Sequence, residues 1–383
     1  IWLSIPVIFA GSHATFFPEV IGEGPVDAVA IGEAELSIAE YLQKLGKDPR
    51  RTRGMWVKEG GRIFRNKLRP LVENLDALPP PDRSIYYKYG FMRDIEMKRF
   101  ISGRGCPNAC SYCFNPSLRA KYQAMGCRAY TRKKSVGRVI EEIAWMREHA
   151  RLKHVHFADD LFTFNHAWVK EFCDAYAKEI GLPFTFNTTA EQLNSEITGA
   201  AARAGCSGIA MGVESGSERI RVMVLNKRMT NEQIIRAGRM IKARGMGLTT
   251  FNMLANPGET IEEAFQTVRL NQQMRTDNPR VTICFPIPQT QLYTNALKGG
   301  YLDEKEFMER YETARSPREM MLKTPEAEQF ENLFYLFRLA CRNPALTGTV
   351  RKMISLPRNA FFRLAATFWP LYEKDFFGIG FVS

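Results

Sequence analysis

The stretch Gly103-Arg104-Gly105-Cys106-Pro107-Asn108-Ala109-Cys110-Ser111-Tyr112-Cys113-Phe114-Asn115-Pro116 carries three cysteines at the spacing C-x-x-x-C-x-x-C. Its glycine, proline and asparagine residues favour tight turns, so the loop can bring three thiol side chains toward one point. Thiolates are the ligands that iron–sulfur clusters prefer. We therefore expect Cys106, Cys110 and Cys113 to hold a 4Fe-4S cluster in which one iron has no protein ligand.

A structural zinc site and a disulfide framework are the two alternatives. A zinc site needs four ligands, commonly in two pairs, and the sequence holds no second C-x-x-C. Disulfide frameworks are typical of short secreted chains, whereas this chain has 8 cysteines in 383 residues and does not begin with a signal-peptide-like segment. The cluster is the favoured interpretation. We expect the isolated cysteines to be small buried apolar residues: Cys127, Cys173, Cys206, Cys284 and Cys341.

The cysteine spacing, with Tyr112 directly before the third cysteine, resembles the signature of the radical S-adenosylmethionine (SAM) enzymes. The resemblance implies that the amine and carboxylate of SAM bind the open iron. It also implies that an electron from the cluster cleaves the sulfonium of SAM and produces a 5′-deoxyadenosyl radical. Such a cleavage requires a cluster near the low end of the known range of potentials. A reducing partner such as flavodoxin or ferredoxin is therefore expected.

The composition is that of an ordinary globular protein, with 45% hydrophobic and 25% charged residues. The 53 Lys and Arg residues outnumber the 41 Asp and Glu residues, giving a net charge of +12. These basic residues are scattered, apart from a cluster at Arg128–Lys134, so we expect no nucleic-acid partner. No apolar run reaches the roughly 18 residues of a membrane span, and we expect a cytoplasmic protein. The sequence begins at Ile1 inside an apolar run, which we interpret as a fragment of a longer protein.

From residue 96 onward, strand-like and helical segments alternate. Strands are predicted at 98–102, 154–158, 184–188, 208–213, 248–254 and 281–285, with helices centred near 142, 173, 200, 236 and 266. Thr230 with Gln233 and Thr260 with Glu263 match the capping-box pattern, which fixes where two helices start. This alternation predicts an α/β fold with a parallel sheet. The family resemblance implies a partial (β/α)6 barrel, in which chemistry gathers at the C-terminal ends of the strands.

We divide the chain into four regions. Residues 1–50 read as strand, loop, strand and helix, an α/β pattern. Residues 51–95 contain a hairpin around Glu59-Gly60-Gly61 and a proline-rich linker around Pro79-Pro80-Pro81. Residues 96–300 form the barrel, and residues 301–383 are helical, aromatic and basic.

The N-terminal region is similar to the C-terminal half of the Rossmann-like cobalamin-binding domain that often precedes a radical SAM barrel. The similarity lies in the segments FAGSHATFFPE and DAVAIGEAEL. It implies that a Gly-Gly pair lining the nucleotide tail of cobalamin falls on Gly11 and Ser12, where Ser12 departs from glycine. His13, Gly32 and Glu33 complete the implied cobalamin site, although a loop histidine is more often a hydrogen-bonding residue than a metal ligand. Because the segment for the lower face of the corrin is not in this sequence, we expect cobalamin in the full-length protein.

Polar residues at two predicted strand ends are candidates for binding SAM. Asp159 and Asp160 end the second strand, where the resemblance places a motif that accepts hydrogen bonds from the SAM amine. One of them could instead cap the following helix. Glu214 and Ser215 end the fourth strand and suit the ribose hydroxyls or the methionine moiety. Because burying a carboxylate without partners is costly, a functional role is favoured for Glu214.

The loop after the fifth strand, Asn252-Met253-Leu254-Ala255-Asn256-Pro257-Gly258-Glu259, resembles the adenine-flanking motif G-x-I-x-G-x-x-E. Asparagine replaces glycine at both glycine positions of the motif. The resemblance assigns Asn256 and Glu259 to SAM, together with Tyr112 of the cysteine motif.

The resemblance predicts cobalamin-dependent methyl transfer to an unactivated carbon of a small molecule, which could be lipid-like or tetrapyrrole-like. An oxidative cyclase and a methylthiotransferase are alternative enzymes. Methylthiotransferases usually carry three further cluster cysteines in an N-terminal domain, and this sequence has no cysteine before Cys106. An iron–sulfur redox sensor is the non-enzymatic alternative, but a sensor would not need the polar strand ends.

The region after residue 300 could cap the open end of the barrel or lie in a membrane interface. Its apolar stretch Ile354–Tyr372 is interrupted by Arg358 and Arg363, so we do not expect it to span a bilayer. Aromatic residues on helices more often belong to a core than to a membrane contact.

Overall fold

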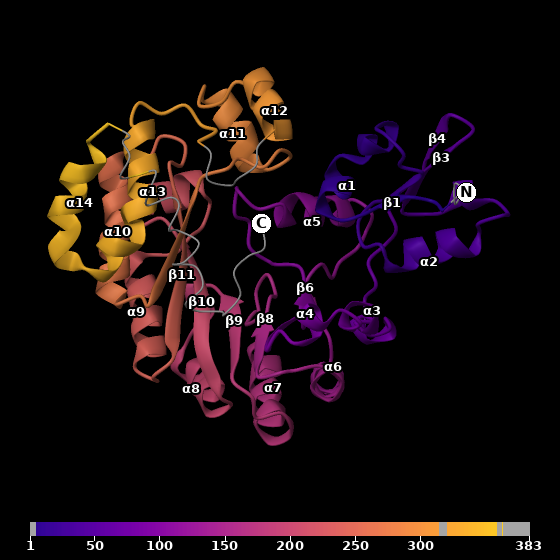
Figure 1. The fold of residues 1–383 in the computed structure, drawn as a ribbon, viewed down its shortest axis with the longest axis horizontal. Helices are drawn as coiled ribbons and strands as arrows, with labels where there is room; N and C mark the ends of the chain where they lie inside the picture. The colour runs from indigo at the N-terminus through magenta and orange to yellow at the C-terminus, as the bar shows by residue number, and fades with distance from the viewer. Residues whose placement is uncertain (1–4, 314–319, 358–361, 363–383) are drawn as a thin grey trace. The chain divides into compact units, whose positions relative to one another are not determined.

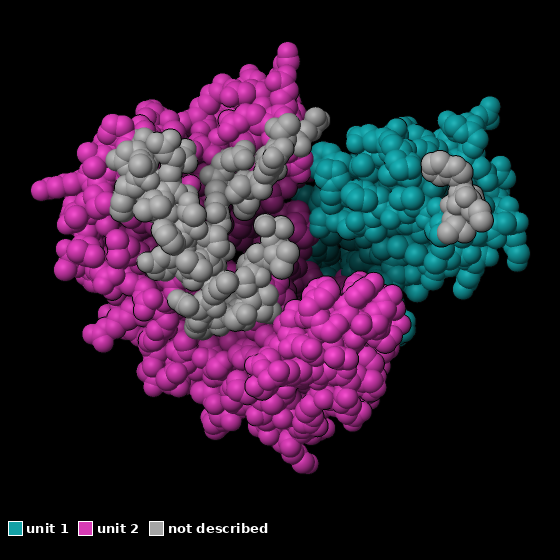
Figure 2. Space-filling model, in the orientation of Figure 1, with its two compact units in different colours: residues 1–79, 117–130 teal, residues 80–116, 131–383 magenta. Residues whose placement is uncertain are grey.

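The computed structural model describes residues 5–313, 320–357 and 362 (Figure 1). The chain forms two compact units, residues 1–79 with 117–130, and residues 80–116 with 131–383 (Figure 2). The structural division differs from the predicted one in two places. The hairpin that we assigned to a linker region belongs to the first unit, and so does the segment 117–130 that follows the cysteine loop.

The first unit is built on a four-stranded sheet in the order β1 (Ile8–Phe9), β2 (Ala28–Ala30), β3 (Met55–Glu59) and β4 (Arg62–Arg65). The pair β1–β2 is parallel, whereas β3 runs antiparallel to both β2 and β4. Gly60 and Gly61 in the predicted hairpin turn have φ values of 57° and 75°, as a tight turn with two left-handed residues requires. The hairpin is therefore confirmed, but it extends the N-terminal sheet.

Short helices surround this sheet. They are α1 (Ser12–Phe16), α2 (Glu35–Gln43), the 3-10 turns Pro18–Gly22, Pro49–Arg51 and Leu75–Ala77, and most of α5 (Asn115–Gln123). The predicted loop Gly11-Ser12-His13 is wrong in part, because Ser12 and His13 form the first turn of α1. The Gly11 carbonyl accepts hydrogen bonds from the Thr15 amide at 3.0 Å and the Thr15 hydroxyl at 2.8 Å, which stabilises this turn.

The second unit contains a six-stranded sheet in the order β12-β11-β10-β9-β8-β5. Its strands, in chain order, are β5 (Met97–Phe100), β8 (His154–Phe157), β9 (Phe184–Thr188), β10 (Cys206–Glu214), β11 (Gly247–Leu254) and β12 (Asn278–Ile283). All neighbouring pairs are parallel. The six predicted strands and the α/β fold are thus confirmed as a half-barrel (Figure 1).

Five helices cover the outer, convex face of this sheet: α6 (Val136–His149), α7 (His166–Glu179), α8 (Ser195–Arg203), α9 (Asn231–Lys242) and α10 (Ile261–Met274) (Figure 1). Both predicted capping boxes are present at the starts of α9 and α10. Alternate strand residues such as Phe157, Phe186 and Met211 pack against these helices in one apolar core. These five helices therefore pack on the convex face of the sheet, and they do not cover the opposite, concave face.

Smaller elements complete the second unit: α3 (Ser84–Tyr87), α4 (Gly90–Arg93), the ribbon β6 (Gly103–Arg104) with β7 (Arg132–Lys133), a 3-10 turn at Ala190–Gln192 and a π-helical turn at Ile220–Val224. At the C-terminal side follow α11 (Gln291–Lys298), α12 (Glu304–Thr313), α13 (Ala327–Arg342), the 3-10 turn Pro344–Leu346 and α14 (Thr347–Ile354).

The helical C-terminal region is confirmed, and its aromatic residues on α13 are buried. Phe330, Phe334 and Phe337 pack with Val281 and Ile283 of β12 in a second core. In the part of the chain that the structure describes, no helix combines the length and apolar character needed to cross a membrane. Of the stretch 354–372 that we considered for a membrane interface, residues 358–361 and 363–372 lie outside the described residues.

Candidate functional site

The cysteine loop is anchored through Ser111 to the π-helical turn Ile220–Val224 and to α11. The Ser111 amide donates to the Leu225 carbonyl at 2.9 Å, and its hydroxyl donates to the Val224 carbonyl at 2.6 Å. The Ser111 carbonyl accepts a hydrogen bond from the Leu292 amide at 2.8 Å. The Val224 and Leu225 carbonyl groups lie at the end of the π-helical turn after β10, a kind of irregularity often found at functional sites. The loop is therefore held by two segments more than 100 residues downstream.

The three thiols of the loop interact electrostatically, as ligands of one cluster would. Burial, with a smaller contribution from the neighbouring Cys110 and Cys113, raises the pKa of the Cys106 thiol to about 11. Burial also raises the pKa values of Cys110 and Cys113. The Asn115 amide and side-chain nitrogens lie 3.5 Å and 3.6 Å from the Cys113 sulfur, where they can donate to a thiolate. Without a metal the thiols are thus protonated, and metal binding would release their protons.

Among the described residues, no three Cys, His, Asp or Glu side chains converge closely enough to bind a single metal ion. Cysteines that each bond a different iron of a cluster need not converge so closely. The set of three soft sulfur donors with nearby amide donors fits an iron–sulfur cluster.

A buried ion pair lies beside the loop, between Glu214 at the end of β10 and Lys227. The Lys227 ammonium lies 2.9 Å from Glu214 Oε1, and the two side chains are 5% and 12% exposed. Tyr112 donates its hydroxyl to the same Glu214 oxygen at 3.0 Å. Burial is the largest single influence and favours a neutral amine, but the Glu214 carboxylate together with Cys110 and Glu191 outweighs it and raises the pKa of Lys227. Two of the predicted residues, Tyr112 and Glu214, are therefore in direct contact.

The ion pair lies over Gly212 on the concave face of the sheet. A Cβ atom at Gly212 would lie 2.5 Å from both Glu214 Oε1 and Lys227 Nζ, so this position has no room for a side chain while the pair holds its place. Glu214 has a φ of 65°, and the ladder between β10 and β11 is irregular between Gly212 and Glu214. Ala255, directly after β11, has a φ of 59°. Non-glycine residues in this conformation are strained, and such strain is concentrated at functional sites.

The adjacent carboxylates Asp159 and Asp160 have different surroundings. Asp159 is 3% exposed and accepts hydrogen bonds from the Ser102 amide at 3.0 Å and the Ser102 hydroxyl at 2.7 Å. The Lys133 ammonium lies 3.1 Å from Asp159 Oδ1. Asp160 is exposed and accepts a hydrogen bond from the Asn115 side chain at 3.1 Å. Asp159 therefore joins the ends of β5, β7 and β8, whereas Asp160 faces the cysteine loop through Asn115.

Ser215, Asn256 and Glu259 come together between the ends of β10 and β11. The buried Glu259 carboxylate accepts hydrogen bonds from the Asn256 amide at 2.9 Å and the Asn256 side chain at 3.0 Å. The Ser215 hydroxyl lies 3.4 Å from its other oxygen. Burial raises the pKa of Glu259 to about 8. The Asn256 carboxamide oxygen is buried and has no hydrogen-bond partner among the described residues, so it can accept one from a ligand.

The five residues assigned to cobalamin lie at the ends of β1 and β2 in the first unit. Gly11, Ser12 and His13 are exposed. The Thr15 hydroxyl donates to the Gly11 carbonyl and accepts from the Gly32 amide at 2.9 Å, which joins the two loops. The next amide, of Glu33, donates to the Tyr122 hydroxyl at 3.0 Å. Gly32 has a φ of 79°, and a Cβ atom at this position would lie 2.3 Å from that hydroxyl, so the position requires glycine.

A family model confirms the nature of the second unit. Residues 100–270 match the Radical SAM superfamily. This segment therefore forms a radical SAM domain. The matched range begins at the end of β5, includes the three cysteines and ends in α10.

Proteins named as methyltransferases are among the chains similar to this radical SAM protein. An uncharacterised methyltransferase of Pyrococcus horikoshii is 30% identical over 302 residues, which are 77% of this chain and 64% of that protein. The cytidylyl-2-hydroxyethylphosphonate methyltransferase of Streptomyces wedmorensis is 22% identical, over 78% of this chain and 62% of that protein. This chain therefore spans less than two thirds of the length of either relative.

The fold resembles that of a solved radical SAM methyltransferase, TsrM from Kitasatospora setae, with cobalamin and a [4Fe-4S] cluster bound. The TM-score is 0.61 with 14% sequence identity, over 77% of this chain and 58% of the other. At this level of identity the comparison shows a shared radical SAM fold.

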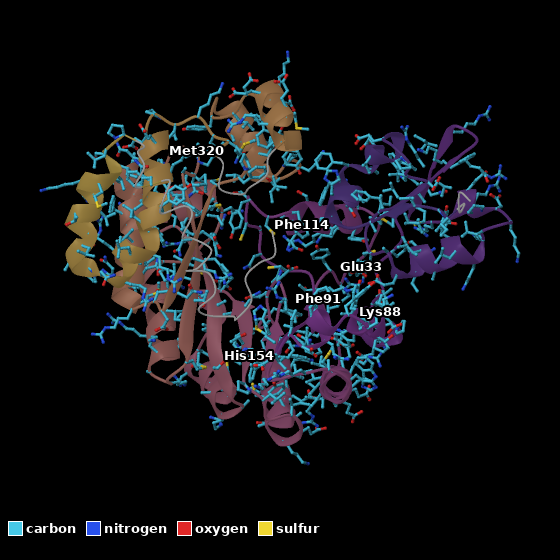
Figure 3. The ribbon with its side chains drawn as sticks, viewed as in Figure 1. Glu33, Lys88, Phe91, Phe114, His154 and Met320 are labelled. Atoms are coloured by element: carbon cyan, nitrogen blue, oxygen red, sulfur yellow. The ribbon has the colours of Figure 1, made fainter. Side chains whose placement is uncertain are left out.

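Sequence reasoning missed several residues of this radical SAM site, above all Lys227, Ser111 and Asn115. Asn226 was missed as well, and its side chain donates to the Ala109 carbonyl in the cysteine loop at 2.8 Å. Lys227 and Asn226 lie more than 100 residues from the loop they contact, and no spacing pattern marks them. Gly212 could have been noticed, because it is a glycine in a predicted central strand, where a glycine often marks close approach of another group. Figure 3 shows the region, with Phe114 labelled directly after the last cysteine.

Proposed function

We propose that this chain is the catalytic part of a cobalamin-dependent radical SAM methyltransferase that methylates an unactivated carbon of a small molecule. The observation that carries the proposal is the loop with three thiols, held against the Tyr112–Glu214–Lys227 contacts at the C-terminal end of the sheet. Relatives named as methyltransferases, with similarity over more than three quarters of this chain, support methyl transfer.

Cys106, Cys110 and Cys113 would hold the cluster, which would supply the electron for reductive cleavage of SAM. The residues around it would orient SAM. Asp160, exposed beside the loop, can accept a hydrogen bond from the SAM amine. The unpartnered Asn256 oxygen can accept one from the adenine amine or a ribose hydroxyl. Asp159 would act indirectly, because Ser102 and Lys133 already occupy its carboxylate oxygens.

Glu214 has one carboxylate oxygen bound to both Tyr112 and Lys227, and its Oε2 remains able to accept a hydrogen bond from a hydroxyl group of SAM. The rigid pair would place that oxygen without reorganisation when SAM binds. Lys227 also lies near Cys110, whose pKa it lowers against the dominant effect of burial. A positive charge at this place would offset part of the negative charge of the cluster.

In the first unit, Gly11, Ser12 and His13 are exposed, and no atom lies within 4 Å of a Cβ placed at Gly11. This open loop fits the approach of an extended ligand such as the nucleotide tail of cobalamin. Gly32 and Glu33 would support it from the neighbouring loop through Thr15. Bound cobalamin would supply the methyl group for transfer.

The test uses the full-length protein, reconstituted anaerobically with iron and sulfide and reduced in the presence of SAM. We expect four irons per chain and formation of 5′-deoxyadenosine, measured by chromatography. The variant Cys113→Ala should lose both. Cys127→Ala is the matched control, because Cys127 packs with Leu71, Tyr122 and Tyr130 in the first unit. The Cys127→Ala variant should still bind four irons and form 5′-deoxyadenosine.

A fully loaded, reduced protein that forms no 5′-deoxyadenosine, even with candidate substrates, would contradict the proposal. Titration with hydroxocobalamin, followed by absorbance, tests the cobalamin part separately. Binding with one cobalamin per chain is expected, and its absence would favour a radical SAM reaction without cobalamin.

A further inference from the structure

The two ends of the cysteine loop are bonded to two consecutive carboxylates. At the start of the loop, the Ser102 amide and hydroxyl donate to the Asp159 carboxylate at 3.0 Å and 2.7 Å. At its end, the Asn115 side-chain nitrogen lies 3.1 Å from Asp160 Oδ2 and 3.6 Å from the Cys113 sulfur. Because Asp159 and Asp160 are neighbours in the chain, they hold both ends of the loop at a set separation.

A buried lysine completes the contacts at the start of the loop. The Lys133 ammonium donates to the Ser102 hydroxyl oxygen at 2.7 Å and to Asp159 Oδ1 at 3.1 Å. The side chains of Lys133 and Asp159 are 6% and 2% exposed. Since the Ser102 hydroxyl donates to the same Asp159 oxygen, the three groups form a closed triangle of hydrogen bonds.

Three aromatic rings fix the position of the Lys133 ammonium. Its nitrogen lies 4.5 Å, 5.4 Å and 4.3 Å from the ring centroids of Phe162, Phe164 and Trp168. Aromatic faces attract a cation at such distances, most strongly where water is excluded. Trp168 is itself held, because its indole nitrogen donates to the Lys134 carbonyl at 2.8 Å. The ammonium is therefore held by three rings in addition to its two oxygen partners.

The backbone also joins Lys133 to the first residues of the loop. Gly103 pairs with Lys133 in the antiparallel ribbon of β6 and β7. The Lys134 amide donates to the Ser102 carbonyl at 2.9 Å. A Cβ atom added to Gly103 would lie 2.8 Å from Lys133 Cδ, so the ribbon packs directly on the stem of the lysine. A shift of Lys133 would therefore move the backbone three residues before Cys106.

Stability alone is a poor explanation for a charge at position 133. Removing an ion pair from water is costly, and well-packed apolar side chains in its place are often equally stable or more so. Phe162 and Trp168 belong to the apolar core and could pack against an apolar side chain at this position. Such a side chain could not donate to Ser102 or orient Asp159. The contribution of the ammonium is therefore orientation.

We propose that Lys133 is a positioning residue for the iron–sulfur cluster. Through Ser102 and Asp159 it fixes the start of the cysteine loop, so that the three thiols are held at the separations that the cluster needs. Lys133 touches no reacting atom and acts only through these two residues. The proposal rests on the proposed function, because it assigns a role at the cluster site of that function.

The test compares variants of the full-length protein after reconstitution with iron and sulfide. The rate at which bathophenanthroline disulfonate removes iron is followed by absorbance. Lys133→Met should release iron about tenfold faster than the parent protein or more, as expected when a group that orients metal ligands is lost. Lys134→Met is the matched control. It breaks the neighbouring pair of Lys134 with Glu142, whose side chains are 17% and 10% exposed, and it should release iron at the parent rate.

Two further measurements separate orientation from general stability. In the cluster-free protein, hydrogen exchange read by mass spectrometry should be faster at residues 102–115 of Lys133→Met, with α10 unchanged. The electron paramagnetic resonance spectrum of the reduced cluster should also differ from that of the parent. Ser102→Ala leaves the Lys133–Asp159 pair in place but removes the hydroxyl that joins the pair to the loop. This variant should release iron faster than the parent, by a smaller factor than Lys133→Met.

Iron release at the parent rate in Lys133→Met, or equally accelerated release in Lys134→Met, would overturn the proposal. If Lys133→Met does not fold, Ser102→Ala decides, and release at the parent rate in that variant has the same consequence. A parent protein that holds its cluster but forms no 5′-deoxyadenosine would instead contradict the proposed function.

Discussion

The two faces of the six-stranded sheet are made by the same strands and differ in almost every property. The convex face carries Phe157, Phe186 and Met211, each 0% exposed and packed under helices. The concave face carries alternate residues of the same strands, among them His156 and Thr185, with hydrogen bonds among the side chains and two polar groups that lack partners among the described residues. The comparison shows that burial alone does not distinguish residues of the apolar core from residues of a polar site, because Thr185 is almost as buried as the phenylalanines.

The two faces differ in the interactions that stabilise their buried side chains. Apolar side chains are stabilised by leaving water and by close packing, so a fold can complete the convex face by itself. Buried polar groups are stable only with hydrogen-bond partners, and on the concave face the Thr249 hydroxyl and the Asn187 carboxamide oxygen have none among the described residues. The loss of stability should therefore be largest for substitutions on the convex face, whereas substitutions of polar groups on the concave face should cost less and some should also change ligand binding.

The largest expected effect is on the convex face. Phe157→Ala should lower the free energy of unfolding by about 3–5 kcal/mol, because it leaves a cavity among Phe100, Phe162, Phe172 and Phe184. Ile101→Ala is the control, since Ile101 is 53% exposed, and it should cost less than about 1 kcal/mol. Denaturant unfolding measures the free energy of unfolding of both variants. Equal losses in the two variants would contradict the large stabilising role assigned to the convex core.

The Glu214–Lys227 pair should give the next largest effect. Lys227→Met leaves a buried carboxylate without its counter-ion, and we expect a loss of about 3 kcal/mol in the free energy of unfolding. Lys170→Met removes one partner of the exposed Lys170–Glu196 pair and should cost at most about 1 kcal/mol. Adding Glu214→Gln to Lys227→Met should recover part of the loss. No recovery would mean that the two side chains do not act as a pair.

His156 should make the stability depend on pH. Its pKa is about 4 in the folded protein, below the usual 6.5, so only the unfolded chain binds a proton between these values. The free energy of unfolding should therefore fall as the pH falls from 6.5 toward 4, by about 2 kcal/mol between pH 7 and pH 5. His156→Gln should make this slope clearly smaller, leaving the contribution of His154, whose pKa burial also lowers, and the exposed His149→Gln should keep the full slope. Urea unfolding at both pH values measures the effect, and an unchanged slope in His156→Gln would contradict it.

The smallest effect is expected at Gly212. Gly212→Ala should displace the ends of Glu214 and Lys227 at a cost of about 1–2 kcal/mol, because these flexible groups can move. The displacement should nevertheless weaken SAM binding, measured by calorimetry on the cluster-loaded protein. Gly137→Ala is the control, since Gly137 lies in α6 with no atom within 4 Å of an added Cβ, and alanine favours a helix. If Gly212→Ala bound SAM like the parent, the pair would not position the cofactor.

The strands and helices of the half-barrel were predictable, because their signals are local. Alternation of residue types marks β9, and the capping boxes at Thr230 and Thr260 mark two helix starts. The cysteine motif could also be recognised from local sequence, because its three candidate ligands lie within eight residues. The division into two units could not be predicted from local signals, because β3 pairs with β2 and residues 117–130 join the first unit by long-range packing.

The sequence by itself determined the alternating pattern of the strands, the order of strands and helices, and the three thiols on one loop. Only the tertiary structure decided which carboxylates act together: Glu214 with Tyr112 and Lys227, and Asp159 with Ser102 and Lys133. The reason is physical. Backbone propensity and side-chain periodicity act between neighbours along the chain, whereas burial, ion pairing and hydrogen bonding act between whatever residues the fold brings within a few ångströms.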